Sequence, residues 1–339
     1  MKTSNILLLA IMFFIFSYPL FGQTSRVGTT GAQFLKIGVG SRAVAMGEAF
    51  AGMADDISAI YWNPAGLARL KQKEAMFQHA FWLASLKFDF ASIVLPFDRK
   101  GTIGIFATFL STPEDEVRTV MRPEGTGEMF SSTDMALGLS FARNMTDQFA
   151  IGINAKYIRQ SLWTMSAAGW AIDFGSMYQT DIKQLRIGLC ISNFGTPLQM
   201  HGRAANMFID IEPEIYGHNE KVKAELSAEK WELPMGLRMG FAFDPVHNEK
   251  MRLTLAGDWA YPNDNHEYVN AGFECAIREM AFIRAGFRGL GMEAMEGGLT
   301  AGGGFKVNFT ETYKLKIDYA FVDYGRLEAT HRFAVSLGF

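Results

Sequence analysis

The chain has 339 residues, of which 49% are hydrophobic and 20% charged, and its formal net charge at pH 7 is -3. This near balance of charge excludes the basic footprint that a nucleic-acid-binding protein needs, so we expect no nucleic-acid partner. The length permits one large all-β domain, because barrels and sandwiches often exceed the usual domain size.

The N-terminus carries a short apolar run, Ile6 to Phe16, that follows Lys2. A run of about eleven residues is too short to cross a bilayer, which takes roughly twenty, and its length is typical of a secretory signal peptide. We therefore predict that residues 1–22 are a signal peptide and that cleavage falls near Gly22. Because Gln23 rather than Cys follows, a lipoprotein anchor is not predicted.

From about residue 75 onward, apolar and polar side chains alternate with a period of two, which is typical of β-strands. Between Tyr313 and Phe321, for example, the odd positions are aliphatic or aromatic, whereas the even positions include two lysines and an aspartate. Turn residues interrupt the alternation. The pattern predicts fourteen strands: 75–83, 87–96, 100–111, 130–143, 148–161, 166–178, 185–194, 233–243, 250–261, 266–277, 280–288, 297–308, 312–322 and 329–339.

The connections between these strands are sorted by length. The even connections are all short, whereas the odd ones, although some of them are brief, include every long one: 112–129, 195–232, 289–296 and 323–328. Outer-membrane barrels have short periplasmic turns and longer outer loops, and a soluble sandwich has no reason for such sorting. We therefore predict an all-β fold, a transmembrane antiparallel β-barrel of about fourteen strands over residues 75–339, surrounded by outer-membrane lipid.

The chain ends on an amphipathic strand whose last side chain is aromatic. Its apolar face is predicted to point to lipid and to supply the signal for assembly into the outer membrane. An edge strand of a soluble sheet would be the alternative for this segment taken alone. The residues of the predicted assembly signal are Phe333, Val335, Leu337 and Phe339.

Residues 23–74, before the first strand, differ in composition and are rich in Gly and Ala. Small residues let backbone approach backbone, as a plug inside a barrel lumen requires. Short helical turns are predicted, with Asp56 or Ser58 and then Asn63 as N-caps and Pro64 at a first helical position.

Within this segment, residues 31–37, 41–47, 54–56 and 61–68 together resemble the N-terminal signature of the PorV/PorQ family, within the FadL-like outer-membrane proteins. The resemblance implies a barrel of fourteen strands with an N-terminal hatch inside its lumen. Some relatives admit hydrophobic compounds, whereas PorV-like members bind cargo of the type IX secretion system, so both functions stay open. The residues of the expected hatch motif are Asp55, Asp56, Trp62, Asn63, Pro64, Ala65 and Gly66.

Catalytic and metal-binding motifs are not apparent. The six histidines form no i, i+4 pair and have no Cys partner at zinc-like spacing, so neither an enzyme, a metal site nor a cofactor is predicted. The pair Asp55 and Asp56 could bind a cation, although helix capping is the favoured interpretation. The lumen-facing cations could form a basic lining, although ion pairs inside the barrel are favoured; these cations are Arg252, Arg284, Arg288, Lys314 and Lys316.

The long connection 195–232 is the predicted binding loop. It holds an apolar series in an acidic setting, and the charge pattern of residues 219–231 suggests a solvated helix. Such a loop would bind secreted protein cargo, a subunit of the secretion machinery or a hydrophobic small molecule, unless it only covers the mouth of the barrel. The predicted contact residues are Met207, Phe208, Ile209, Ile211 and Tyr216.

Overall fold

The computed structural model describes residues 27–97, 100–182, 185–211, 214, 221–292, 295–310 and 312–339. The predicted signal peptide and Tyr216 lie outside these residues. Among the described residues, no helix is long and apolar enough to cross a membrane.

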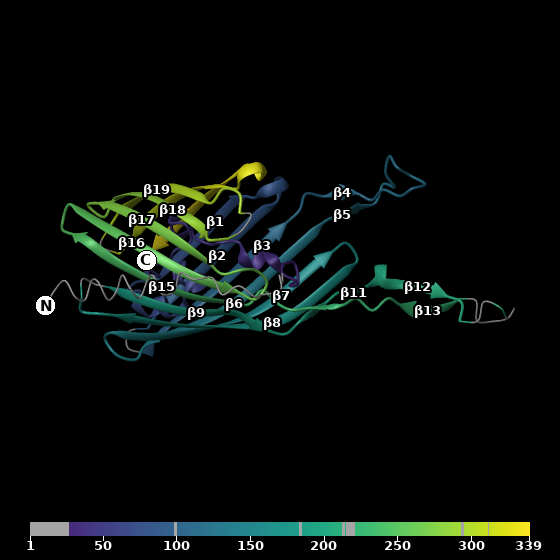
Figure 1. Cartoon of the computed structure of the whole chain (residues 1–339), viewed down its shortest axis with the longest axis horizontal. Helices are drawn as coiled ribbons and strands as arrows, with labels where there is room; N and C mark the ends of the chain where they lie inside the picture. Colours follow the sequence, from purple (N-terminus) through teal and green to yellow (C-terminus); the bar gives the residue numbers. More distant parts are fainter. Residues whose placement is uncertain are drawn as a thin grey trace.

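One antiparallel sheet dominates the structure and closes on itself (Figure 1). The sheet has 15 strands among the described residues; fourteen form the wall, and the short β11 (His201–Gly202) pairs only with the end of β8. The seam joins β1 to β21. The wall strands are β1 (Glu74–Phe81), β2 (Lys87–Pro96), β3 (Thr102–Ser111), β6 (Ser132–Asn144), β7 (Phe149–Leu162), β8 (Met165–Gln179), β9 (Arg186–Gly195), β15 (Gly236–His247), β16 (Met251–Pro262), β17 (Tyr268–Ile277), β18 (Ala281–Leu290), β19 (Leu299–Asn308), β20 (Lys314–Asp323) and β21 (Ala329–Gly338).

These strands confirm the fourteen that the sequence predicts, with bounds that differ by a few residues. The period-two alternation arises because successive side chains of a strand point to opposite faces. On β6, Leu137, Leu139 and Phe141 are exposed, whereas Gly138 and the other residues between them are buried. The outer face of the wall is therefore apolar, as contact with lipid tails requires.

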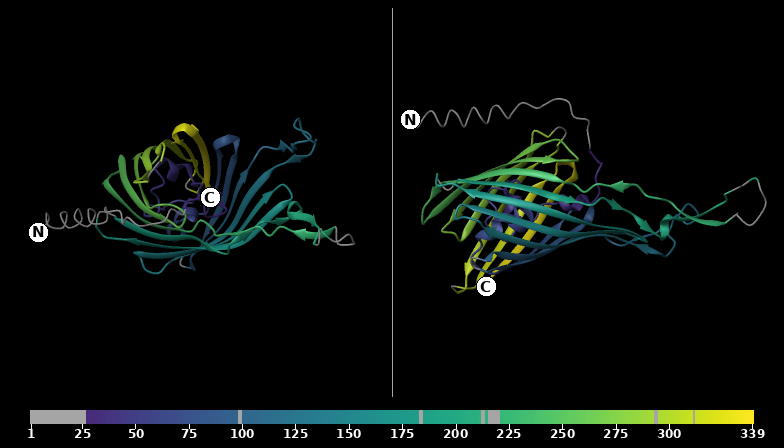
Figure 2. Two further views of the ribbon diagram at one scale, coloured as in Figure 1. Left: turned by 45° about the vertical axis from the view of Figure 1, so that its right-hand side comes forward. Right: turned by 90° about the horizontal axis from the view of Figure 1, so that it is seen from below.

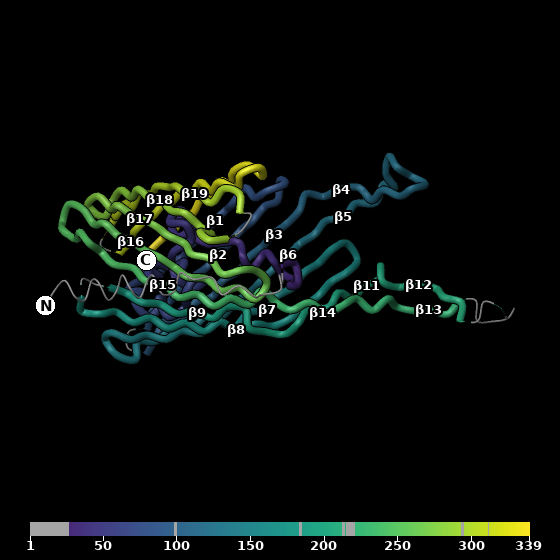
Figure 3. Tube along the Cα trace, in the orientation of Figure 1, coloured from purple at the N-terminus to yellow at the C-terminus, as the bar shows by residue number. Residues whose placement is uncertain are grey.

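Two hairpins extend beyond the wall at the same end of the barrel (Figure 1). The first pairs β4 (Asp115–Glu116) with β5 (Met129–Phe130). The second belongs to the long connection, whose arms pair first as β10 (Leu198–Gln199) with β14 (Lys230–Trp231) and then as β12 (Asn206–Ile209) with β13 (Val222–Glu225). Figure 3 follows this connection outward through β12 and back through β13.

The helix predicted for residues 219–231 is wrong, because the described part of this range forms β13 and β14. In β13, Val222 and Ala224 alternate with charged residues. This is a period of two, and hydrogen bonds across the hairpin to β12 decide the conformation.

Residues 31–70, which we call the inner segment, lie inside the ring of strands (Figure 2). They form four short helices: η1 (Gln33–Lys36), α2 (Ser41–Ala45), α3 (Ala59–Trp62) and η2 (Pro64–Arg69). This segment contributes half of the buried hydrophobic core among the described residues, including the fully buried Val39, Met46 and Phe50. The lumen is thus filled by protein, and the core of the molecule is the contact between this segment and the inner wall.

Close approach of two backbones makes this filling possible. A Cβ atom added at Gly188 of β9 would lie 2.0 Å from the carbonyl oxygen of Ala51, which no real side chain tolerates. Glycine on the inner face of the strand therefore lets the inner segment touch the wall.

The last strand completes the wall. Phe333, Val335 and Leu337 point outward and are exposed, while Arg332 on the opposite face is fully buried. Beyond the strand, the backbone N–H of Phe339 donates to the carbonyl oxygen of Lys73, 2.9 Å away, so the C-terminus is fixed beside the start of β1.

Deletion of Phe339 tests the predicted assembly signal. It removes one partly buried side chain, which contributes at most about 1.5 to 3 kcal/mol of burial, too little to unfold a closed barrel. We expect the variant to refold in detergent with normal heat-modifiable mobility, yet to be lost from the outer membrane of cells, as measured by immunoblot of membrane fractions. Normal outer-membrane levels would exclude an assembly role for this residue.

Candidate functional site

The inner segment is held to the wall by a buried charge. Arg42, on helix α2, directs its guanidinium at Glu274 of β17, whose side chain is fully buried. Two hydrogen bonds join them, Nε to Oε2 at 2.7 Å and Nη2 to Oε1 at 2.9 Å. This fork geometry is the strongest form of an arginine–carboxylate contact, and it fixes α2 against the wall.

Arginines of the wall complete the same cluster. The Glu274 carboxylate also accepts from Arg252 Nη2 at 3.1 Å and from Arg284 Nε at 2.7 Å, and Arg284 reaches Asp318 at 2.6 Å. Elsewhere in the barrel, Lys316 pairs with Glu74 at 3.3 Å and Arg288 lies 3.6 Å from Glu48. The favoured interpretation, ion pairs inside the barrel to Asp258, Asp318 and Glu274, is therefore confirmed for Arg252 and Arg284, whereas Arg288 and Lys316 pair with Glu48 and Glu74 instead.

The pair Asp55 and Asp56 lies on the other side of Arg42. Arg42 Nη1 is 2.7 Å from Asp55 and 2.9 Å from Asp56, and Asp55 is also 3.5 Å from Arg186. Asp56 in addition accepts from the backbone N–H of Ser58 at 2.8 Å, beside the start of α3. Both carboxylates thus have cationic partners within the protein, an arrangement that favours capping and ion pairing over cation binding.

Asn63 links the inner segment to the wall. Its Oδ1 accepts from the backbone N–H of Ala65 at 3.2 Å and so caps η2, and Pro64 is the first residue of that helix, as the sequence predicts. Its Nδ2 donates to the carbonyl oxygens of Ala51, at 2.9 Å, and of Ser176 on β8, at 3.0 Å. One side chain therefore starts the helix and attaches it to the barrel.

Three further residues of the expected hatch motif, Trp62, Ala65 and Gly66, are also closely packed. Trp62 is buried and donates from Nε1 to the carbonyl oxygen of Val39 at 2.6 Å. Ala65 is fully buried, and a Cβ atom added at Gly66 would lie 2.0 Å from the carbonyl oxygen of Ala54. Trp62 and Gly66 of the motif therefore contact other parts of the inner segment.

Further wall residues, which were not predicted as site residues, bond the backbone of the inner segment. Gln78 accepts from the N–H of Gly40 at 2.6 Å, and Thr300 accepts from the N–H of Gly47 at 2.9 Å. Asp258 accepts from the N–H groups of Phe50 and Ala51, at 2.9 and 2.8 Å. Inward-facing polar residues on strands were the available signal, but their partners depend on the three-dimensional position of the inner segment.

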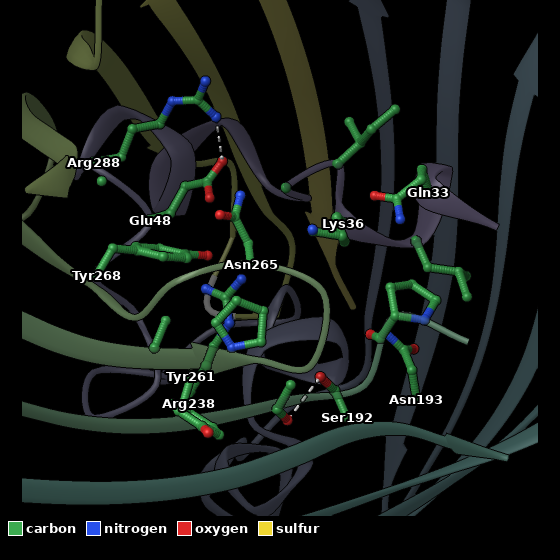
Figure 4. Close-up of a pocket in the computed structure, with 18 of the residues that line it drawn as sticks. Gln33, Lys36, Glu48, Ser192, Asn193, Arg238, Tyr261, Asn265, Tyr268 and Arg288 are labelled. Atoms are coloured by element: carbon green, nitrogen blue, oxygen red, sulfur yellow. Dashed lines mark hydrogen bonds and ion pairs between the residues drawn. The ribbon is translucent and has the colours of Figure 1, made fainter. Parts of the chain in front are cut away.

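A cavity of about 300 Å³ lies between the inner segment and the wall, at the end of the barrel that carries the long loops (Figure 4). Strand ends contribute Arg238, Tyr261, Tyr268 and Arg288, and the inner segment contributes Glu48 together with residues of η1 and α3. Its surface combines aromatic rings, aliphatic side chains and several cations.

The predicted binding loop is separate from this cavity. Met207, Phe208 and Ile209 form most of β12 and are exposed, Phe208 at 70%, and Ile211 follows at 58%. The structure places them on the hairpin that extends from the barrel (Figure 1). In the described part of the chain, no group of three or more His, Cys, Asp or Glu side chains is arranged to hold a metal ion.

This architecture defines the class of the protein: a closed, fourteen-stranded transmembrane β-barrel of the FadL-like type. Residues 21–260 match the model of the family described as type IX secretion system protein PorV, and the chain belongs to this family. A search of curated proteins gave no match.

Solved structures with a similar fold include two toluene transporters and a FadL homologue. The toluene transporter TodX of Pseudomonas putida is 14% identical, with 93% of this chain and 99% of that chain covered and a TM-score of 0.58. The toluene transporter TbuX of Ralstonia pickettii is 13% identical, with 89% and 97% covered and a TM-score of 0.55. A Pseudomonas aeruginosa FadL homologue is 9% identical, with 89% and 98% covered and a TM-score of 0.55. At these identities the similarity shows the fold alone.

Replacing both Asn63 and Pro64 by Ala tests whether the inner segment plugs the barrel. Loss of an N-cap costs about 0.5 to 2 kcal/mol, enough to loosen η2 but too little to unfold the wall. We expect normal heat-modifiable mobility and a raised leak conductance in planar bilayers. Asn248→Ala, which removes the cap of an exposed turn, is the matched control and should leave conductance unchanged. Equal conductance in all three proteins would contradict a plugging role.

A second contact ties the start of the inner segment to the loop between β16 and β17. Asp264 accepts from Thr30 Oγ1 at 2.7 Å, Gln33 Nε2 at 2.7 Å and Lys36 Nζ at 2.8 Å. Burial opposes the ionised form, but these hydrogen bonds outweigh it and hold the pKa of the Asp264 carboxyl below its ordinary value.

Acidification should therefore release this contact. Because the folded pKa is lowered, its stabilisation is complete above the unfolded value of about 3.9 and is lost as the pH falls through the folded pKa. We expect Asp264→Asn to increase hydrogen exchange of residues 30–37 at pH 7, and the native protein to show the same increase, after correction for intrinsic rates, only in the acid range. Asp181→Asn, at an exposed turn, is the control. Protection that does not change in Asp264→Asn would contradict the assignment.

Proposed function

We propose that this protein acts in the bacterial outer membrane as a component of type IX secretion. In this proposal the chain is exported through its N-terminal signal peptide, inserts as a barrel, and presents its long-loop end to secreted protein cargo or to subunits of the secretion machinery. Membership of the PorV family and the apolar outer face of the wall support the proposal. Its chemistry is that of binding, and no enzymatic step is invoked.

The β12–β13 hairpin is the observation that carries this proposal. All four residues of β12 are exposed, and three of them are large and apolar. Exposed apolar side chains gathered on one projecting element are typical of a protein interaction site. A hairpin of two strands is marginally stable in water, so a partner that covers it would also stabilise it.

The backbone of the hairpin supports the same proposal. Among the described residues, β12 and β13 pair with each other and form a sheet of two strands. Each outer edge therefore offers N–H and C=O groups to which a partner strand can add. Charged residues on β13, Lys223 and Glu225, would then favour partners with complementary charges.

The inner segment acts in this proposal as a hatch that closes the barrel to solutes while the outer end binds protein. The charge cluster around Glu274, the double attachment of Asn63 and the filled lumen support this role. Binding at the surface and closure of the lumen are then independent functions of one scaffold.

Uptake of hydrophobic small molecules is the second candidate function. The cavity beside Trp62 favours it, since aromatic and aliphatic side chains line a large part of its surface. TodX is described as a toluene transporter, and its fold is similar to this one. Passage through the barrel would require movement of the inner segment, so this function predicts solute flux that depends on the hatch and not on the hairpin.

Serine substitutions in the hairpin discriminate between the two functions. Phe208→Ser combined with Ile209→Ser removes two exposed apolar side chains that make no core contact, so the barrel should fold and insert normally. We expect co-purification of secreted proteins or machinery subunits from native membranes to fall by about tenfold or more, the scale of losing interface anchors.

The matched control is Val120→Ser with Met121→Ser, on the connection 112–129, where the two side chains are 98% and 90% exposed. This control should keep the partners. Equal recovery from the hairpin variant and the native protein would refute the hairpin assignment. Equal loss from both variants would refute it too, because binding would then depend on apolar surface in general.

A further inference from the structure

The cavity at the long-loop end has an unusual charge balance. Among the described residues that line it, four side chains are cationic, Lys36, Lys156, Arg238 and Arg288, and one carries a carboxylate, Glu48. Three of these cations have carboxylate neighbours: Lys36 pairs with Asp264 at 2.8 Å, Lys156 with Asp173 at 2.6 Å, and Arg288 with Glu48 at 3.6 Å.

Arg238 is different. Within the described residues no carboxylate lies within ion-pair distance of its guanidinium, and its Nη1 atom is shielded from solvent without a hydrogen-bond partner. The contact that the group does make is with the face of the Trp62 ring, whose centroid is 4.7 Å from the Arg238 Cζ atom. Arg238 thus borders the cavity without a direct ion pair, and an anion that enters the cavity would supply one.

The geometry of the arginine side chain indicates which kind of anion would bind. Its planar fork matches a carboxylate through two parallel hydrogen bonds. Because the other three cations each have a carboxylate partner, Arg238 is the one described lining cation without a direct ion pair, which matches a monoanion better than a dianion.

Size and surface select the rest of the ligand. An apolar cavity of about 150 Å³ holds one benzene molecule, so a volume near 300 Å³ accommodates roughly two fused rings. Aromatic side chains Trp62, Trp82 and Tyr268 border the space and provide ring surfaces for an aromatic guest. Figure 4 shows Tyr268, Arg238 and Arg288 around this space.

We propose that the cavity binds a compact aromatic monocarboxylate, with its carboxylate on Arg238 and its rings against the aromatic wall. This site is distinct from the β12–β13 hairpin and does not depend on the proposed role in secretion. The ligand enters from the long-loop end, where the strand ends that border the cavity lie.

Binding of 2-naphthoate to the full-length protein in detergent tests the proposal by isothermal titration. We expect the native protein to bind 2-naphthoate about tenfold or more tightly than the neutral 2-naphthamide, since hydrogen bonds to charged groups are worth at least this factor. Acetate, which has the charge without the rings, should bind too weakly to measure.

Variants locate the charge that is responsible. Arg238→Met keeps the length and removes the guanidinium, so it should weaken 2-naphthoate by about tenfold or more and leave 2-naphthamide within about twofold. Arg238→Lys should restore part of the preference. Arg159→Met, an exposed cation that does not border the cavity, is the matched control and should bind like the native protein.

Equal affinities of the native protein for 2-naphthoate and 2-naphthamide would overturn the proposal, because the cavity would then be a purely apolar site. Absence of binding would overturn it as well. The comparison of acid and amide is made on the native protein, so it decides the question even if Arg238→Met fails to fold. Recovery of secreted partners by each variant is measured separately, so failure here leaves the secretion proposal standing.

Discussion

The buried charge of Arg42 is the constraint on which the interior depends. Breaking the pairing of a buried charge is strongly destabilising, and Glu274, Asp55 and Asp56 pair this guanidinium from two sides. Glu274 also pairs with two arginines of the wall, Arg252 and Arg284, whereas the other partners of Arg42 belong to the inner segment. The wall therefore contributes the Glu274 carboxylate, and the inner segment contributes the Arg42 side chain that binds it.

The two ends of the molecule differ in the same physical terms. Inside the barrel, backbone and side chains are joined by hydrogen bonds to strands on several sides, which favours a single position of the inner segment. At the long-loop end, the β12–β13 hairpin has exposed apolar side chains and open edges. Rigidity inside and exposure outside suit a scaffold that is closed to solutes and open to partners.

The wall could be predicted from the sequence because strand alternation and loop length are local properties, and the capping role of Asn63 is local too. The contact of Arg42 with Glu274 could not, since the two residues are 232 positions apart and meet only after the barrel forms. Residues 222–225 were predicted as helix because charge spacing was given more weight than the alternation of Val222 and Ala224. Arg238 was not predicted as a site residue, because a cavity is formed by several elements and leaves no pattern in the sequence of a single strand.

The seam between β1 and β21 has a consequence for biogenesis. Because the first and last strands of the wall pair with each other, the ring cannot close until the whole chain is available. Arg332 on the closing strand donates to the carbonyl oxygen of Gly38 at 2.6 Å, so closure of the seam also brings the wall against the inner segment. A chain that loses the inner segment would therefore close with Arg332 and Glu274 deprived of these partners.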